Sequence, residues 1–164
     1  MGLSHDFDQE LQTLTLAGGP LPANIRVSNQ RGVNLTAVVT SADTLGCAIS
    51  EIEVFVPQLQ SSTFDVLKEW AKQLSQRVTY LLEQIGPLEF DEQAGQVLIR
   101  SNKPDQLPDG AQYYEIVLSR HGAGNFLLKR YQFTKGQAGR QPVDMLLTRQ
   151  VITKLIDDLE ATIP

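Results

Sequence analysis

Apolar residues recur at alternating spacings of three and four in the middle of the chain. That spacing lines up one continuous apolar stripe along a single face of an α-helix. Thr63 precedes the stripe at a suitable N-cap position, and Gly86 and Pro87 follow it as residues that commonly end a helix. The pattern therefore predicts a long helix over about 63–85. The stripe consists of Phe64, Leu67, Ala71, Leu74, Val78, Leu81 and Ile85.

Two interpretations of this stripe are open. It can cover the apolar face of a sheet in its own chain, or part of it can pair with a second copy of itself. The residues beside the stripe carry little of the complementary charge that sets the register of a coiled coil, so sheet packing is favoured. Trp70 and Tyr80 lie off the stripe and are candidates either for packing at its edge or for an exposed interface.

Weaker helical patterns stand near both ends of the chain. We predict a second long helix over about 142–161, where Pro142 suits the first turn because a missing N–H costs nothing there. Residues 4–17 mix helical with alternating spacing, and we expect a short, loosely packed helix within 1–20, with a strand as the alternative. The apolar face of the last helix consists of Leu147, Val151, Ile152, Leu155, Ile156 and Leu159.

Alternating apolar and polar residues predict strands on both sides of the central helix. Their connections are short, which favours antiparallel pairing. In the third segment the apolar residues change parity near Ser50, and a β-bulge there is the simplest explanation. The expected strands are 25–28, 33–40 and 45–56 before the central helix, and 88–90, 96–100, 113–119 and 126–133 after it.

The order of elements is therefore (α)βββ-α-ββββ-α. We expect an α+β fold and a single domain over 1–164, in which a mainly antiparallel sheet carries two long helices on one face. This order is loosely similar to that of small acidic secretion chaperones, which dimerise and hold extended partner segments. No sequence motif supports the similarity, so it is an analogy of fold alone.

Composition and charge narrow the function classes. The chain has 164 residues, 41% of them hydrophobic, and a net charge of −5, which fits a globular domain and disfavours general attraction to nucleic acid or anionic lipid. Cys47 is the only cysteine, which excludes an internal disulfide and a two-cysteine metal site. The chain lacks a signal-peptide pattern and an apolar run of about 20 residues, so we expect a cytoplasmic protein without a membrane partner.

One basic and aromatic segment is a candidate binding site. Lys129, Arg130 and Tyr131 lie in a predicted strand, and single-stranded nucleic acids are bound by such combinations, because bases stack on rings while cations contact phosphates. That function requires all three side chains to point outward from one face. Glu115 is expected to face Lys129 or Arg130 across the hairpin and to offset their charge. A solvated sheet face is therefore favoured, and we do not expect nucleic acid as a partner.

Arg120 and His121 are a second candidate site. They begin the sequence RHGAGN between two predicted strands, where backbone donors of a glycine-rich turn can hold an anion. The alternative, which we favour, is an ordinary hairpin turn with a solvated histidine.

Residues of the third strand supply the remaining candidates for chemistry. Glu51 and Glu53 share one face, where they can act in acid–base chemistry, bind a cation or simply form the polar outer surface, which we favour. Cys47 is expected to be a core residue, because a nucleophilic role needs a nearby histidine. No catalytic motif or zinc spacing is present, and we expect no cofactor.

Together these observations favour a non-catalytic, chaperone-like protein that binds a protein partner or itself, as a homodimer. The alternatives are a nucleic-acid-binding module that uses Lys129, Arg130 and Tyr131, or a small-ligand-binding protein or enzyme. The last alternative predicts a pocket between sheet and helices with His121, or Glu51 and Glu53, at its rim.

Overall fold

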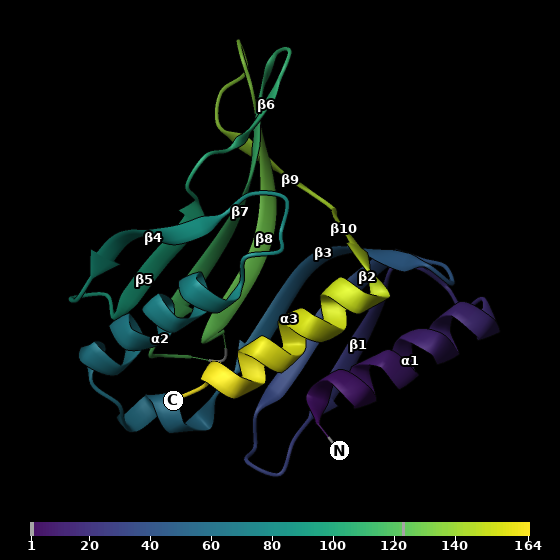
Figure 1. Ribbon diagram of the computed structural model, residues 1–164, viewed down its shortest axis with the longest axis horizontal. Coiled ribbons are helices and arrows are strands. Elements are labelled where there is room, and N and C mark those ends of the chain that lie inside the picture. The colour runs from purple at the N-terminus through teal and green to yellow at the C-terminus, as the bar shows by residue number, and fades with distance from the viewer. Residues whose placement is uncertain (1, 123) are drawn as a thin grey trace.

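The computed structural model describes residues 2–122 and 124–164. In this part of the chain, ten strands form one antiparallel sheet, and three α-helices lie together on one of its faces (Figure 1). The expected α+β class and the order of elements are confirmed, although three helices of similar length replace two long ones. The helices are α1 (Leu3–Ala17), α2 (Phe64–Arg77) and α3 (Arg149–Thr162), and a short 3₁₀ helix, η1 (Pro57–Ser61), precedes α2. The strands are β1 (Ala23–Ser28), β2 (Asn34–Ala42), β3 (Gly46–Phe55), β4 (Ile85–Asp91), β5 (Gln96–Ser101), β6 (Asp105–Leu107), β7 (Gly110–Ser119), β8 (Phe126–Thr134), β9 (Arg140–Val143) and β10 (Met145–Thr148).

The main strands follow the order β1-β2-β3-β8-β7-β5-β4. At its centre, β3 and β8 pair only between Ile52 and Val54 on one side and Phe126 and Leu128 on the other. Beyond that short contact a single segment bridges the two strands: β9 pairs with β8 and β10 pairs with β3 (Figure 1). We call this segment, residues 140–148, the β9–β10 strap.

The bulge expected near Ser50 is present. Val38 pairs with Glu51 and the next residue, Val39, pairs with Ile49, which leaves Ser50 without a partner of its own. One extra residue reverses the parity of a strand, so the apolar residues on both sides of the bulge reach the helix-covered face. Ile49 and Ile52 are both fully buried as a result.

The central helix is shorter than its stripe predicted, because α2 ends at Arg77 instead of residue 85. Leu81 and Ile85 are buried, but from a loop and from the start of β4 rather than from a helix. Gly86 and Pro87 accordingly lie within β4 and do not end the helix. A spacing of three and four residues indicates which residues are buried, but it does not by itself establish a helix. Here tertiary contacts bury Leu81 and Ile85 although their backbone is not helical.

The last helix also begins later than predicted, at Arg149 instead of residue 142. The Thr148 side chain caps it by accepting a hydrogen bond of 3.1 Å from the Val151 amide. Pro142 lies in β9, and β10 shows the alternation of a strand, since Leu146 is exposed while its neighbour Leu147 is buried. Leu147 entered the predicted helical row only because it stands four residues before Val151.

The N-terminal segment contains the helix α1, whose last residue, Ala17, is followed by Gly18 in a left-handed conformation with a φ of 60°. Leu3, Phe7 and Leu11 recur at a four-residue spacing and are at most 1% exposed, so α1 contributes to the core. It packs beside α3 and over β1 and β2, while α2 covers β4, β5 and β7 (Figure 1). None of the helices in residues 2–122 and 124–164 combines the length and apolar character needed to cross a bilayer.

Candidate binding surface on the uncovered sheet face

The sheet face opposite the helices is the first candidate for a functional surface. Successive side chains of a strand point to opposite faces, so half of the residues in each strand point away from the helices. Residues that are direct cross-strand partners share a face. The register of the sheet therefore shows which residues of each strand lie on the uncovered face. On the central strands this face carries Tyr113, Glu115 and Val117 of β7, opposite Tyr131, Lys129 and Leu127 of β8, and Leu98 and Arg100 of β5, opposite Val117 and Glu115.

Side chains from four strands meet on this face around Glu115. Arg140 of β9 donates hydrogen bonds from Nη1 and Nη2 to the two Glu115 carboxylate oxygens, at 2.6 and 3.0 Å. Arg100 of β5 donates from Nε and Nη2 to Glu115 Oε1, at 3.2 and 2.9 Å. We call the group the tyrosine–arginine cluster. It consists of Arg100, Tyr113, Glu115, Lys129, Tyr131 and Arg140.

The two tyrosines hold the guanidinium groups of this cluster in place. The Arg140 guanidinium lies 3.7 Å from the ring centroid of Tyr131, and its Nη1 donates to the Tyr113 hydroxyl at 3.2 Å. The Arg100 guanidinium lies 5.0 Å from the Tyr113 ring centroid, and the two tyrosine rings are 6.0 Å apart. Stacking and hydrogen bonding together fix the orientation of both arginines before any partner arrives.

The electrostatics of the cluster favour anions. Burial of Glu115 opposes its ionisation, but hydrogen bonds from Arg140 and Arg100 outweigh burial and lower its pKa. The hydrogen bond to Glu115 in turn raises the pKa of Arg140. Three cations against one carboxylate give the cluster a net charge of +2, within a chain whose net charge is −5. Among the described residues, Lys129 has no ion-pair partner within 4.0 Å.

A shallow hollow of about 360 Å³ lies on the same face, over the first three strands. Glu53 belongs to its lining and is the cross-strand partner of Leu127, which lies beside the cluster. Cluster and hollow are therefore neighbours on one surface. The hollow is lined by Arg26, Asn34, Thr36, Glu53 and Phe55.

The segment predicted to form a nucleic-acid site does not present its three side chains together. Lys129 and Tyr131 lie on the uncovered face, whereas Arg130 points to the helix side and is 3% exposed. Its Nη1 and Nη2 each donate a 3.1 Å hydrogen bond to Glu83, and its guanidinium lies 4.2 Å from the Tyr114 ring centroid. The prediction that Lys129, Arg130 and Tyr131 all point outward from one face is therefore wrong. Neighbouring residues of a strand alternate between its two faces. Glu115 does face Lys129, as expected.

Trp70 and Tyr80 contact the last helix. Trp70 is 1% exposed, and its indole Nε1 donates to the Thr162 hydroxyl at 3.1 Å. The Tyr80 hydroxyl donates to Asp158 Oδ2 at 2.7 Å, and burial together with this hydrogen bond raises its pKa. Both aromatic residues therefore dock α3, and the Trp70 ring is inaccessible to a partner.

Arg120 and His121 lie at the end of the β7–β8 hairpin. The Arg120 amide donates to the Gly95 carbonyl at 3.1 Å and its Nη1 to the Ser62 carbonyl at 3.1 Å, which ties this hairpin to its neighbours. His121 is exposed. The middle of the RHGAGN sequence, Ala123, lies outside the described residues, so the proposed anion cradle has no described geometry.

The possible catalytic or ligand-binding residues of β3 lie on different faces of the sheet. Glu51 and Glu53 lie on the uncovered face, so they do not stand at the rim of a pocket between sheet and helices. Within residues 2–122 and 124–164, no group of three or more His, Cys, Asp or Glu is arranged to hold a metal ion. Cys47 is 7% exposed, and burial raises the pKa of its thiol to about 11, in keeping with the expected core position.

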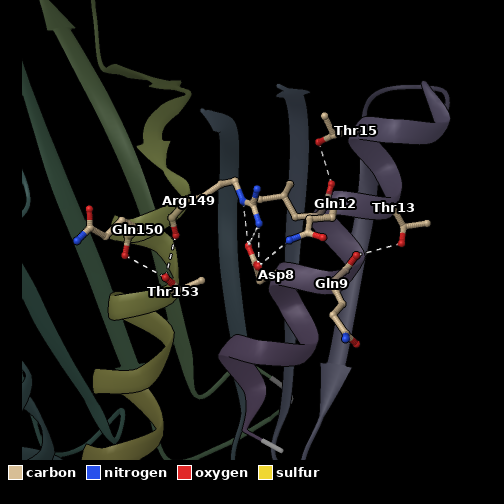
Figure 2. A network of polar contacts seen from close by, with 9 residues as sticks. Asp8, Gln9, Gln12, Thr13, Thr15, Arg149, Gln150 and Thr153 are labelled. Carbon is tan, nitrogen blue, oxygen red and sulfur yellow. Dashed lines mark hydrogen bonds and ion pairs between the residues drawn. The ribbon is translucent and has the colours of Figure 1, made fainter. Parts of the chain in front are cut away.

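A second exposed surface lies where α1 ends and α3 begins. Leu16, Leu45 and Leu146 are 85%, 80% and 78% exposed, and we call them the leucine corner. They line two neighbouring pockets of about 250 and 300 Å³. Close to this corner, Arg149 at the start of α3 donates hydrogen bonds of 2.8 to 3.0 Å to Asp8 on α1 (Figure 2).

The sequence did not indicate that Arg100 and Arg140 belong to this cluster, where both donate hydrogen bonds to Glu115. They stand 40 positions apart and meet only because β5 and β9 flank the β7–β8 pair. Strand parity was the available signal, since it places Lys129 and Tyr131 with Tyr113 and excludes Arg130. In comparisons of the whole chain, no protein-family model, no curated protein and no solved structure matched it.

Proposed function

We propose that this chain is a non-catalytic protein-binding domain, chaperone-like in that it holds a partner segment without modifying it. The observation that supports this proposal best is the tyrosine–arginine cluster at the centre of the uncovered sheet face. Tyrosine and arginine are, with tryptophan, enriched in the parts of interfaces that contribute most to affinity.

The geometry of the cluster suits binding rather than proton transfer. Both arginines are fixed on one carboxylate, and the lowered pKa of Glu115 keeps that carboxylate ionised near neutral pH. Because Glu115 and the tyrosine rings already immobilise the arginine side chains, a partner loses less conformational entropy on docking there.

A photo-crosslinking experiment tests this proposal. A photoreactive amino acid replaces Phe133, which is 44% exposed on the uncovered face beside Arg140 but outside the cluster, or, as the matched control, the exposed Lys72 on α2. In the cells that produce the protein, we expect a discrete crosslink to another polypeptide from position 133 and none from position 72. Equal crosslinking from both positions, or none from position 133, contradicts the proposal.

Self-association is the second part of the proposal, and the leucine corner supports it. Leu45 and Leu146 line one pocket, and Leu16 lines a second pocket together with Thr44, the neighbour of Leu45. Large apolar side chains exposed in this way suit a self-complementary contact. We propose a homodimer formed through this corner. Leu146 pairs with Ala48 and points away from the helix-covered side that buries Leu147, so this contact uses the β10 end of the uncovered face.

A nucleic-acid-binding module is the alternative function, and one observation favours it. Two tyrosines and three cations share the uncovered face, as in proteins that stack bases and contact phosphates. Glu51, Glu53 and Glu115 lie on that face as well and oppose a polyanion. Binding to a single-stranded oligonucleotide that weakens steeply with salt is the test of this alternative.

A further inference from the structure

We propose that the tyrosine–arginine cluster recognises a carboxylate side chain in an extended, acidic segment of a partner protein. This inference rests on the proposed protein-binding function and names the chemistry of the partner. It follows from the donors that the cluster leaves free, from its charge and from the apolar row beside it.

Each arginine of the cluster keeps one donor edge unused. Arg140 contacts Glu115 through the Nη1–Nη2 edge, and Arg100 contacts it through the Nε–Nη2 edge. Among the described residues, Arg140 Nε and Arg100 Nη1 donate no hydrogen bond. A guanidinium has a second two-donor edge that matches a carboxylate, so each arginine retains such an edge while it holds Glu115. Their side chains are 37% and 34% exposed.

The charge of the cluster is complementary to one or two carboxylates. Lys129 lies directly opposite Glu115 and forms no ion pair with any residue that the structure describes. The cluster keeps a net charge of +2 after Glu115 is counted. Glu53, beside Leu127, limits the positive region to the cluster itself. A short acidic stretch therefore fits this surface better than a long polyanion, whose charges would also meet the flanking glutamates.

An apolar row lies next to the cluster, two residues further along each strand. Val117 is the cross-strand partner of both Leu127 and Leu98 on the uncovered face, and each of the three is half-buried. Two residues of a strand span about 7 Å, which is also the distance between same-face side chains of an extended peptide. A segment that lies along the strands with a carboxylate at the cluster therefore places its next same-face side chain over this row. The expected partner pattern is an acidic residue followed or preceded, two positions away, by an apolar one.

Short labelled peptides test the inference. The probe is a fluorescein-labelled peptide with one glutamate and, two residues later, a valine; matched probes replace the glutamate with glutamine or lysine. We expect the glutamate peptide to bind the full chain about tenfold more tightly than the glutamine peptide, and the lysine peptide not to bind. Equal affinity for the glutamate and glutamine peptides, or no binding of the glutamate peptide up to millimolar concentration, overturns the inference.

Variants of the cluster separate geometry from charge. Lys129→Gln and Arg140→Lys are each expected to weaken binding of the glutamate peptide about tenfold, the second because lysine keeps the charge but lacks the two-donor edge. Lys72→Gln on α2 changes the net charge by the same amount as Lys129→Gln and is expected to leave binding unchanged. If Lys72→Gln weakens binding as much as Lys129→Gln, general electrostatics explains the affinity and the inference fails. Unchanged circular dichroism confirms that each variant is folded.

The outcomes distinguish this inference from the proposed function. A crosslink from position 133 to a polypeptide, combined with no preference for glutamate over glutamine, keeps the protein-binding function and rejects carboxylate recognition. A single-stranded oligonucleotide that binds more tightly than the glutamate peptide, and loses affinity in Lys129→Gln, rejects both in favour of the nucleic-acid alternative.

Discussion

Arg130 and Glu83 form a two-point ion pair inside the protein, where their side chains are 4% and 5% exposed. The Ser101 hydroxyl donates to the same carboxylate at 3.1 Å. This pair holds the segment between α2 and β4 against the helix-covered side of β8. The segment lies in the part of the apolar stripe that continues beyond the end of α2.

Removing Arg130 is expected to destabilise the protein strongly. Arg130→Met leaves the Glu83 carboxylate buried without its cation, and breaking such a pair costs about 3–5 kcal/mol of the free energy of unfolding. Urea denaturation measures this loss. Lys129→Met, on the same strand but the opposite face, is the matched control and is expected to cost less than about 1 kcal/mol.

The double variant Glu83→Gln with Arg130→Met tests the cause of that loss. It removes the orphaned charge, so it is expected to recover part of the stability lost in Arg130→Met alone. A double variant that is less stable than Arg130→Met would show that lost packing of the arginine, and not the unpaired carboxylate, dominates.

The stability of the protein is expected to depend on Glu115 at acidic pH. The pKa of Glu115 is lowered in the folded protein from an ordinary value of 4.5, so folding favours its ionised form. Its contribution to the free energy of unfolding is fully present above pH 4.5 and is lost as the pH falls through 4.5 to below the folded pKa. Stability curves of the wild type and Glu115→Gln measured across this range should converge towards low pH. Parallel curves contradict the prediction.

The thiol of Cys47 is expected to react slowly with a disulfide reagent in the folded protein. It is 7% exposed and burial raises its pKa to about 11, so little thiolate is present and access is poor at pH 8. Reaction with Ellman's reagent should accelerate about a hundredfold or more in denaturing urea. A cysteine at the 80% exposed position nearby, Leu45→Cys in a Cys47→Ala background, is the control and should react rapidly without urea.

The leucine corner is expected to control the mass of the protein in solution. Analytical ultracentrifugation should find a dimer for the wild type and a monomer for Leu146→Asp, because a buried unpaired charge opposes the contact. Leu82→Asp is the control, since Leu82 is equally exposed but lies outside the corner. A wild-type monomer at high concentration excludes the dimer, and dissociation by both variants excludes the corner as its site.

The class and order of this fold followed from the sequence because amphipathic periodicity records which residues are buried. The parity change at Ser50 was readable for the same reason, since a single unpaired residue shifts all apolar positions behind it. Helix ends were not readable. Val78, Leu81 and Ile85 continue the stripe although α2 ends at Arg77, and the pairing of Glu83 in this segment with Arg130 of β8 has no local sequence signal.

The candidate site was readable only in part. Lys129 and Tyr131 were recognised, but their neighbour Arg130 was grouped with them although strand geometry separates adjacent residues. Arg100 and Arg140 were assigned no shared role, because their meeting at Glu115 depends on the lateral order of strands. Nothing in local sequence encodes the fact that β5 and β9 lie on opposite sides of the β7–β8 hairpin.

The β9–β10 strap has a mechanical consequence for the whole sheet. Residues Arg140–Val143 pair with β8 and Met145–Thr148 pair with β3, so Asp144 is the only residue between the two paired segments. The Thr40 hydroxyl donates a 2.8 Å hydrogen bond to its side chain. If the part of the sheet that contains β3 rotates against the part that contains β8, the β9–β10 strap is strained immediately. Amide protons of β3 and β8 should therefore exchange with solvent in one common opening event. A partner that binds either part of the sheet should slow amide exchange in both parts.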